Sequence, residues 1–170
     1  MSISRFPAYL RLIGAGTFHA ADDAEAPAKL TVFETDPATG VATLSALLDR
    51  LDDMGRLAPR APLSFLVVKV SGLGQCDTDD SLKQIADRIR ELSRATDVVG
   101  RLTGTTFGIA LQSTGVTAAG AVAARLTHHL NRLAELSPSI CVTVSAATGT
   151  GINAETLPIA AMDTAQPCCG

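Results

Sequence analysis

Aromatic and basic residues are scarce in this sequence. Its 170 residues include no tryptophan, one tyrosine and five phenylalanines. Single-stranded nucleic acids are commonly held by stacking on aromatic side chains, so this composition argues against that class of binding protein. The 14 lysines and arginines face 17 aspartates and glutamates, which gives a net charge of −3. We therefore expect no basic surface for a nucleic-acid polymer or an anionic membrane.

Long apolar runs and paired cysteine motifs are also missing. No segment approaches the roughly 20 apolar residues of a membrane-spanning helix, and Arg11 interrupts the apolar stretch near the N-terminus. The cysteines, which show no CxxC spacing, are Cys76, Cys141, Cys168 and Cys169. This spacing argues against a zinc site and against a disulfide framework. The sequence thus predicts a cytoplasmic protein with free thiols, no membrane span and no bound metal.

What the sequence does contain is a high share of hydrophobic residues, 46%, against 18% charged residues. This balance favours one well-buried globular domain over a disordered chain. Residues 1–35 form an N-terminal extension that includes a small-residue, acidic linker. Residues 36–165 carry regular helix and strand patterns and constitute the predicted domain. Residues 166–170 are expected to be a C-terminal tail.

The apolar periodicity within the domain alternates between helices and strands. The expected helices cover residues 42–57, 79–93, 117–136 and 153–165, and the expected strands cover 62–70, 97–102, 107–111 and 139–150. Only 103–106 separates the second strand from the third, which is typical of an antiparallel hairpin. The order predicts an α/β fold, with a central mixed sheet covered by helices.

Six short motifs in the same order resemble the GGDEF domain of diguanylate cyclases, which shares its fold with class III nucleotide cyclases. The motifs are DPATG (36–40), LKQIADRI (82–89), RATDVVGRL (94–102), TGTTF (103–107), VTVSAATG (142–149) and AMDTA (161–165). Each is weak alone, but together they keep the order and spacing of the family. The resemblance covers residues 36–165 and implies the family's fold.

The resemblance also implies which residues catalysis would need. In the family, two GTP molecules are condensed with Mg²⁺ held by an aspartate at the end of the first strand and an acidic residue of the signature turn. Lys69 occupies the strand position, and the signature positions are Thr103, Gly104, Thr105, Thr106 and Phe107. A protonated lysine cannot bind Mg²⁺, and hydroxyls replace carboxylates poorly. Gly74 and Asp77 stand where the family has its phosphate-contacting lysine and guanine-binding asparagine. We therefore expect no cyclase activity and no magnesium.

The R-x-x-D motif before the signature is retained as Arg94 and Asp97. In the family this motif is an inhibitory site that binds the product, cyclic di-GMP, together with an arginine on the following helix, here Arg125. A guanidinium fork matches the O6/N7 edge of guanine, and a carboxylate accepts hydrogen bonds from its N1–H and 2-amino groups. The R-x-x-D pattern alone is weak evidence for a ligand site, because Arg50 and Asp53 also fit it. The evidence lies in its spacing from the signature TGTTF, which is that of the family.

The resulting hypothesis is a degenerate GGDEF domain that acts as a cyclic di-GMP receptor, with Arg94, Asp97 and Arg125 gathered beside the empty turn. Its partners would be cyclic di-GMP, a second copy bridged by the ligand, and a downstream signalling protein. Two alternatives stay open. Arg94 and Asp97 could form a solvated ion pair, worth at most about 1 kcal/mol. The domain could also serve only as a protein-interaction or dimerisation module without a ligand.

Overall fold

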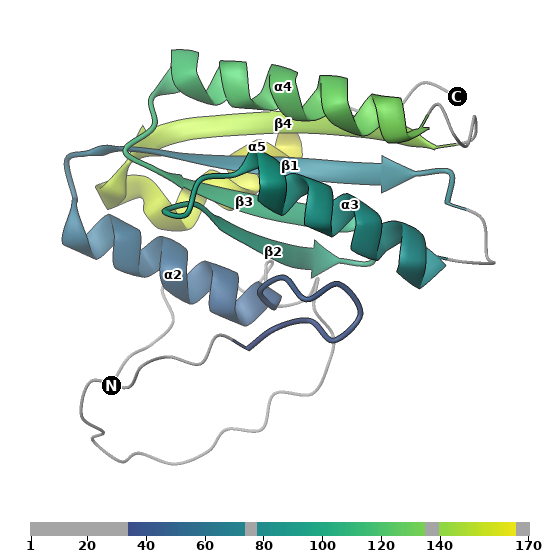
Figure 1. Cartoon of the computed structure of the whole chain (residues 1–170). Coiled ribbons are helices and arrows are strands. Elements are labelled where there is room, and N and C mark those ends of the chain that lie inside the picture. The colour runs from purple at the N-terminus through teal and green to yellow at the C-terminus, as the bar shows by residue number, and fades with distance from the viewer. Residues whose placement is uncertain (1–33, 74–77, 135–139, 166–170) are drawn as a thin grey trace.

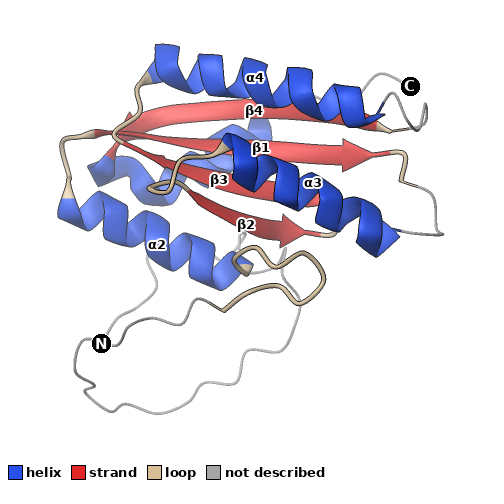
Figure 2. Ribbon diagram, in the orientation of Figure 1, coloured by secondary structure: helices blue, strands red, loops and turns tan. Residues whose placement is uncertain are grey.

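The structure, a computed structural model, describes residues 34–73, 78–134 and 140–165. Helices lie on both faces of a four-stranded sheet (Figures 1 and 2). The elements are α2 (Leu44–Leu57), β1 (Pro62–Ser71), α3 (Thr78–Leu92), β2 (Val98–Thr103), β3 (Thr106–Gln112), α4 (Val116–Ala134), β4 (Cys141–Thr150), the 3₁₀ helix η1 (Gly151–Thr156) and α5 (Leu157–Asp163). This order and the helix-covered sheet confirm the predicted fold class.

The strands lie in the order β2-β3-β1-β4, and all three ladders between them are antiparallel. The connection through α3 makes β2 run parallel to β1, but β3 lies between these two strands. Parallel pairing is therefore confined to one isolated bridge between Ala42 and Gly100. The sheet is thus less mixed than the alternation of helices and strands suggested.

Two hydrophobic cores form because β1 is covered on both faces. Leu63, Phe65 and Val67 pack with α2 and α5 in one cluster. The alternate residues Leu66, Val68 and Val70 pack with α3 and α4 in the other. Successive side chains of a strand point to opposite faces, so a continuous apolar run is needed when both faces are covered. This explains why residues 62–70 show no polar alternation.

The predicted helices 79–93 and 117–136 begin within one residue of α3 and α4, and the other two differ for identifiable reasons. The first helix begins at Leu44 rather than at residue 42, because Thr43 is its N-cap and accepts the Ala46 N–H at 3.4 Å. The last predicted helix, 153–165, is divided into η1 and α5, with Pro158 in the first turn of α5. Proline has no N–H to donate to the preceding turn, so it fits the start of a helix better than its interior.

The prediction of free thiols is wrong at Cys141, the first residue of β4, because this residue is disulfide-bonded. The other cysteines lie outside the described residues. A disulfide requires two Cα atoms within about 7 Å, a condition that the fold decides and the spacing of cysteines along the chain does not reveal.

None of the helices that the structure describes between residues 34 and 165 has the length and apolar character needed to span a bilayer.

Candidate ligand-binding site

The signature turn between β2 and β3 is held to the end of β1 by its main chain. Gly104 has a φ of 42°, a left-handed conformation that glycine adopts without strain. The Thr105 carbonyl accepts the Val70 N–H at 3.0 Å. Lys69 is exposed and is paired with Thr106 in the ladder between β1 and β3. The side chains at the two positions where the family would hold its metal are therefore the Lys69 ammonium group and the Thr106 hydroxyl.

Within residues 34–73, 78–134 and 140–165, no three His, Cys, Asp or Glu side chains group closely enough to hold a metal ion. Phe107, the last signature residue, is fully buried and belongs to the core between the sheet and helices α3 and α4. Gly74 and Asp77, which were placed at nucleotide-contacting positions, lie outside the described residues.

Arg94 and Asp97 form a closed turn between α3 and β2. The Asp97 Oδ2 accepts the backbone N–H of Arg94 at 2.8 Å, and the backbone N–H of Asp97 donates to the Arg94 carbonyl at 3.0 Å. Aspartate commonly closes turns in this way, because its short side chain reaches a nearby backbone N–H. The turn fixes the carboxylate at the residue that precedes β2.

The second oxygen of Asp97 is in a different position. Oδ1 is buried and accepts no hydrogen bond from the described residues. Burial raises the pKa of Asp97, while the Arg94 backbone N–H and the positive charges of Arg94 and Arg125 act in the opposite direction. A buried acceptor without a partner is unfavourable by about 1–3 kcal/mol, so a hydrogen-bond donor brought to Oδ1 would relieve a penalty already present.

Arg125 projects from α4 towards the end of α3. Its Nη2 donates to the carbonyl of Leu92, the last residue of α3, at 2.7 Å. A cation is favourable there because the C-terminal end of a helix carries partial negative charge. The other N–H groups of this guanidinium have no partner in the described part of the chain. The Arg125 side chain is also close enough to Asp97 for its positive charge to act on that carboxylate and favour a lower pKa.

The ion pair between Arg94 and Asp97, which the sequence left open as an alternative, is not formed. The ion pairs of the described residues include neither of them, and the Arg94 side chain is exposed. The guanidinium groups of Arg94 and Arg125 thus lie near the Asp97 carboxylate without forming an ion pair with it.

This neighbourhood does not lie beside the signature turn, as the sequence suggested. Asp97 comes just before the first residue of β2, whereas the turn follows its last residue. Six residues of extended strand span roughly 20 Å. The candidate ligand site and the turn are therefore at opposite ends of β2.

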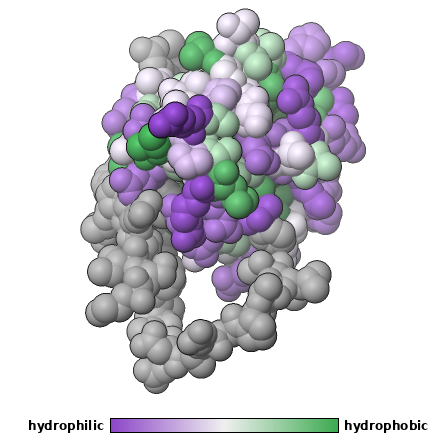
Figure 3. All heavy atoms as spheres, turned by 90° about the vertical axis from the view of Figure 1, so that its left-hand side faces the viewer, coloured by the Kyte–Doolittle hydropathy of each residue, from purple (hydrophilic) through white to green (hydrophobic). Residues whose placement is uncertain are grey.

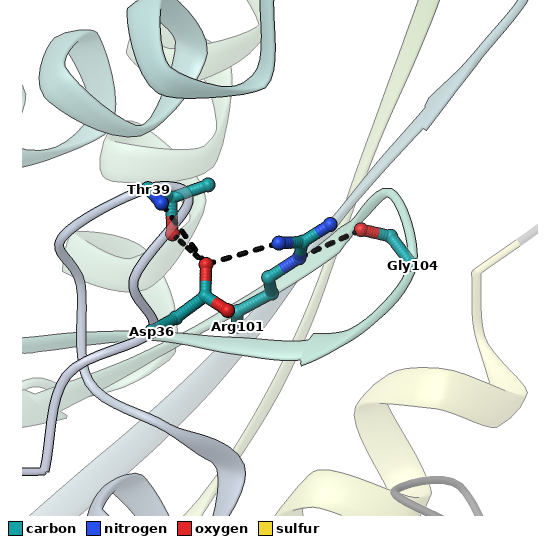
Figure 4. A network of polar contacts seen from close by, with 4 residues as sticks. All are labelled: Asp36, Thr39, Arg101 and Gly104. Atoms are coloured by element: carbon teal, nitrogen blue, oxygen red, sulfur yellow. Dashed lines mark hydrogen bonds and ion pairs between the residues drawn. The ribbon is translucent and has the colours of Figure 1, made fainter. Parts of the chain in front are cut away.

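A polar network that the sequence did not reveal joins the segment before α2 to the hairpin (Figure 4). Asp36 Oδ2 accepts the Thr39 N–H at 3.0 Å and the Thr39 hydroxyl at 2.6 Å. The Arg101 Nη1 binds the same oxygen at 3.0 Å, and its Nε donates to the Gly104 carbonyl at 2.9 Å. Burial opposes ionisation of Asp36, but the Thr39 hydroxyl and Arg101 outweigh it and lower its pKa.

A second unexpected contact lies one helical turn beyond Arg125. The Arg88 Nη2 is 3.3 Å from the His129 Nδ1, and the Arg88 Nη1 forms an ion pair with Glu91 at 2.6 Å. Partial burial and the charges of Arg88, His128, Arg132 and Arg125, in that order, lower the pKa of His129. The facing sides of α3 and α4 are thus locally basic, although the chain as a whole is acidic.

The candidate site lies where α3 ends and β2 begins. The face at the left of Figure 1, where α3 ends and β2 begins, shows hydrophilic residues with small separate hydrophobic areas (Figure 3). A cleft of about 450 Å³ lies elsewhere, between α2 and η1, and its lining includes Gly55, Arg56, Gly151 and Glu155. None of the predicted site residues lines it.

Solved structures of GGDEF domains resemble this fold. The FimX GGDEF domain from Pseudomonas aeruginosa has a TM-score of 0.65 at 21% identity, over 79% of this chain and 94% of that one. The GGDEF domain of DgcB from Caulobacter crescentus, solved in complex with c-di-GMP, has a TM-score of 0.59 at 17% identity, over 86% and 88%. At these identities the likeness concerns the fold.

SiaD from Pseudomonas aeruginosa, a diguanylate cyclase solved with its activator SiaC, has a TM-score of 0.63 at 23% identity. The alignment covers 75% of this chain but only 56% of SiaD. No curated protein matches the chain. The family model described as "Diguanylate cyclase, GGDEF domain" matches residues 34–157, well over half of the sequence. The chain therefore belongs to the GGDEF domain family.

Proposed function

We propose that this GGDEF domain is a catalytically inactive receptor for cyclic di-GMP, which it binds through Arg94, Asp97 and Arg125. The observation that carries the proposal is the Asp97 Oδ1, a buried acceptor without a partner in the described residues, placed near two guanidinium groups that it does not neutralise. A guanine base supplies the missing donors through its N1–H and 2-amino groups.

The remaining groups suit the rest of the ligand. The exposed Arg94 presents a planar fork of donors that matches the O6 and N7 acceptors of guanine. Arg125 keeps donors for a phosphate or for a second guanine. DgcB, which shares the fold, was solved in complex with c-di-GMP, and another GGDEF domain was described in an interaction with the same dinucleotide. These structures support the choice of ligand.

Loss of the cyclase reaction is proposed from the residues at the turn. Charge on the transferred phosphoryl group is normally neutralised by divalent cations bound to carboxylates. Lys69 and Thr106 face each other at the two relevant positions. Incubation with GTP and Mg²⁺ should therefore yield no cyclic dinucleotide, and product above the level of a buffer control would contradict this part of the proposal.

Isothermal titration calorimetry with cyclic di-GMP tests the receptor role directly. The wild-type chain should bind, and Arg94→Ala should weaken binding by at least about tenfold, because a hydrogen bond to a charged group contributes roughly 1.5–3 kcal/mol. Arg60→Ala removes an exposed arginine from the connection between α2 and β1 and should leave binding unchanged. Absence of binding to the wild type, or equal binding by Arg94→Ala, would refute the receptor role.

A second function, a protein-interaction module, is favoured by one observation. Leu57 and Ile152 are large hydrophobic residues with 79% and 70% of their surface exposed, and Ile152 lines the cleft between α2 and η1. If this is the domain's working surface, Leu57→Ser with Ile152→Ser should abolish capture of a signalling partner and leave cyclic di-GMP binding intact. Arg94→Ala should then have no effect on that capture.

A further inference from the structure

Among the residues that the structure describes, none pairs with the outer side of β4, which is an open sheet edge. β4 pairs only with β1 among the described strands. Just beyond the strand, the Gly151 N–H donates to the Ala61 carbonyl at 3.2 Å. Bonded pairs alternate along an antiparallel ladder, so the odd-numbered residues of β4 bond to β1. The backbone groups of Val142, Val144, Ala146, Thr148 and Thr150 face away from β1, and no hydrogen bond from them to another described residue is found.

The opposite edge of the sheet is protected, which makes this exposure distinctive. Ala42 bonds to β2 on both sides, donating its N–H to the Val99 carbonyl at 3.0 Å and accepting the Arg101 N–H at 2.8 Å. β2 also carries a charged residue and a register shift between Arg101 and Thr103. Charges, irregular register and covering segments are the usual means by which proteins keep an edge strand from pairing with another chain.

β4 has none of these protections in its own sequence. The strand CVTVSAATGT contains no charged residue and no proline over its ten residues. Four of the residues whose backbone faces outward, Val142, Val144, Thr148 and Thr150, are β-branched and favour extended structure. Long, uncharged edges of this kind are templates for a further strand.

The side of α4 above this edge is also uncharged. Arg125 and His129 contact α3 or its last carbonyl, so their side of α4 faces α3. The side turned away from α3, given 100° per residue, carries only uncharged residues: Val116, Gly120, Ala123, Ala124, Thr127 and Asn131. Val116 is 73% exposed, and a Cβ built on Gly120 would meet nothing within 4 Å.

We infer that a second copy of this chain pairs with the β4 edge, antiparallel and about a twofold axis at Ala146, so that two sheets become one. This register places Val144 opposite Thr148 and Val142 opposite Thr150 of the other copy, which brings outward-facing groups together as bonded pairs. Helices that lie side by side are about 8–10 Å apart. The small residues at Gly120, Ala123 and Ala124 permit the two α4 helices to approach to that distance.

A second copy fits better than a different protein because the strand edge and the side of α4 above it are both uncharged. A twofold interface repeats the same residues on both sides, so a charge close to the axis would meet its own like charge from the other copy. Neither the edge of β4 nor the adjoining side of α4 carries one. A strand from another protein would give no reason for this neutrality. The pairing needs no ligand, so it is independent of the proposed receptor function.

Sedimentation equilibrium of the full chain without nucleotide tests the inference. The wild type should sediment as a dimer. Ala146→Pro removes an outward-facing N–H but keeps the bonds to β1, and Gly120→Lys places like charges against each other across the axis. Each variant should raise the dimer dissociation constant by at least about tenfold. Ala121→Lys, at an exposed position one residue along the helix and on its other side, is the matched control and should remain dimeric.

Two results would overturn the inference. A wild type that sediments as a monomer would show that the edge is not used for self-pairing, or that another segment of the same chain covers it. A dimer that persists in both Ala146→Pro and Gly120→Lys would place the contact elsewhere. Circular dichroism melts of all variants establish that they are folded, and Gly120→Lys separates the interface from any local effect of proline, because lysine is the better helix former.

Discussion

Asp97 is the residue on which the proposed ligand site depends, because its two oxygens are in unequal surroundings. Oδ2 closes the turn with the Arg94 N–H, and Oδ1 is buried without a partner in the described residues. Only the ionised carboxylate can accept two hydrogen bonds from a guanine, since a protonated oxygen is a donor. The protonation state of Asp97 should therefore control binding.

The first prediction is a pH dependence of cyclic di-GMP affinity. Burial raises the pKa of Asp97 above 3.8 in the free protein, so protonation competes with the ligand at a higher pH than for an ordinary aspartate. Affinity should be constant near neutrality, fall as the pH drops through this raised pKa, and be accompanied by proton release at acid pH. Calorimetry in buffers of different ionisation enthalpy measures both effects.

Asp97→Asn is the control for this pH dependence. The amide keeps an acceptor for the Arg94 N–H but cannot titrate, so its binding should be weak at every pH and lack the acid limb. A wild-type acid limb that persists in Asp97→Asn would show that another group controls binding.

The second prediction concerns the ion pair between Asp36 and Arg101. Asp36→Asn should lower the free energy of unfolding at pH 7 by roughly 1–3 kcal/mol, because the pair is four-fifths buried and hydrogen-bonded on both sides. The pKa of Asp36 is lowered in the folded state. Its contribution is thus complete above 3.8 and disappears as the pH falls through the lower folded value. Urea unfolding at neutral and acid pH measures the difference.

Asp53→Asn gives the comparison for Asp36. Asp53 pairs with Arg56, but about half of each side chain is exposed. Surface pairs contribute little, so this variant should change stability by less than about 0.5 kcal/mol. An effect as large as that of Asp36→Asn would show that burial is not what distinguishes the two pairs.

At the scale of elements, α2 and η1 are in contact through glycine. A Cβ on Gly55 would lie 2.6 Å from the Gly151 carbonyl oxygen and 2.8 Å from the Ala154 Cβ. Both atoms belong to backbone or to a short side chain, so the helix and the 3₁₀ segment would have to move apart. This contact sets the distance between the two elements.

The third prediction compares two glycine substitutions. Gly55→Ala should destabilise the fold by roughly 1–3 kcal/mol through overpacking. Gly120→Ala should stabilise it by about 0.5–1 kcal/mol, because alanine is the better helix former and nothing lies within 4 Å of the new Cβ. Thermal melts of both variants test the contrast. Similar effects of the two substitutions would contradict it.

The sequence predicted elements well where their apolar pattern is strong and local. The central strand at 62–70 and the helices flanking it were placed within one or two residues. Boundaries were wrong where one side chain decides them, as at Thr43, which caps α2, and at Pro158, which begins α5. Caps and prolines act through single hydrogen bonds, which a periodicity does not contain.

The candidate site was only partly predictable. The motif pattern brought Arg94, Asp97 and Arg125 together, and the structure places them near one another. Their distance from the signature turn was not foreseen, because it depends on β2 running straight between them. The pair of Asp36 and Arg101 joins residues 65 positions apart. Such long-range contacts become visible only when strands are in register.

For the molecule as a whole, the fourth prediction is stabilisation by the ligand. A ligand that binds only the folded state at about 100 times its dissociation constant adds roughly 2.7 kcal/mol. For a domain of this size that corresponds to a rise in Tm of roughly 5–10 °C. Cyclic di-GMP should produce this shift in the wild type and none in Arg94→Ala. A shift with GTP equal to that with cyclic di-GMP would argue against the proposed ligand.

The position of β1 has a consequence for how the protein opens. This strand is bonded to β3 on one side and β4 on the other, and both of its faces are covered. Its amide protons are bonded alternately to the two neighbouring strands, so exchange of the whole strand requires both ladders and both cores to separate, which amounts to global unfolding. Its amides should therefore exchange last in the chain, and those of β2 earlier, so that the isotope uptake of β1 measures the stability of the entire domain.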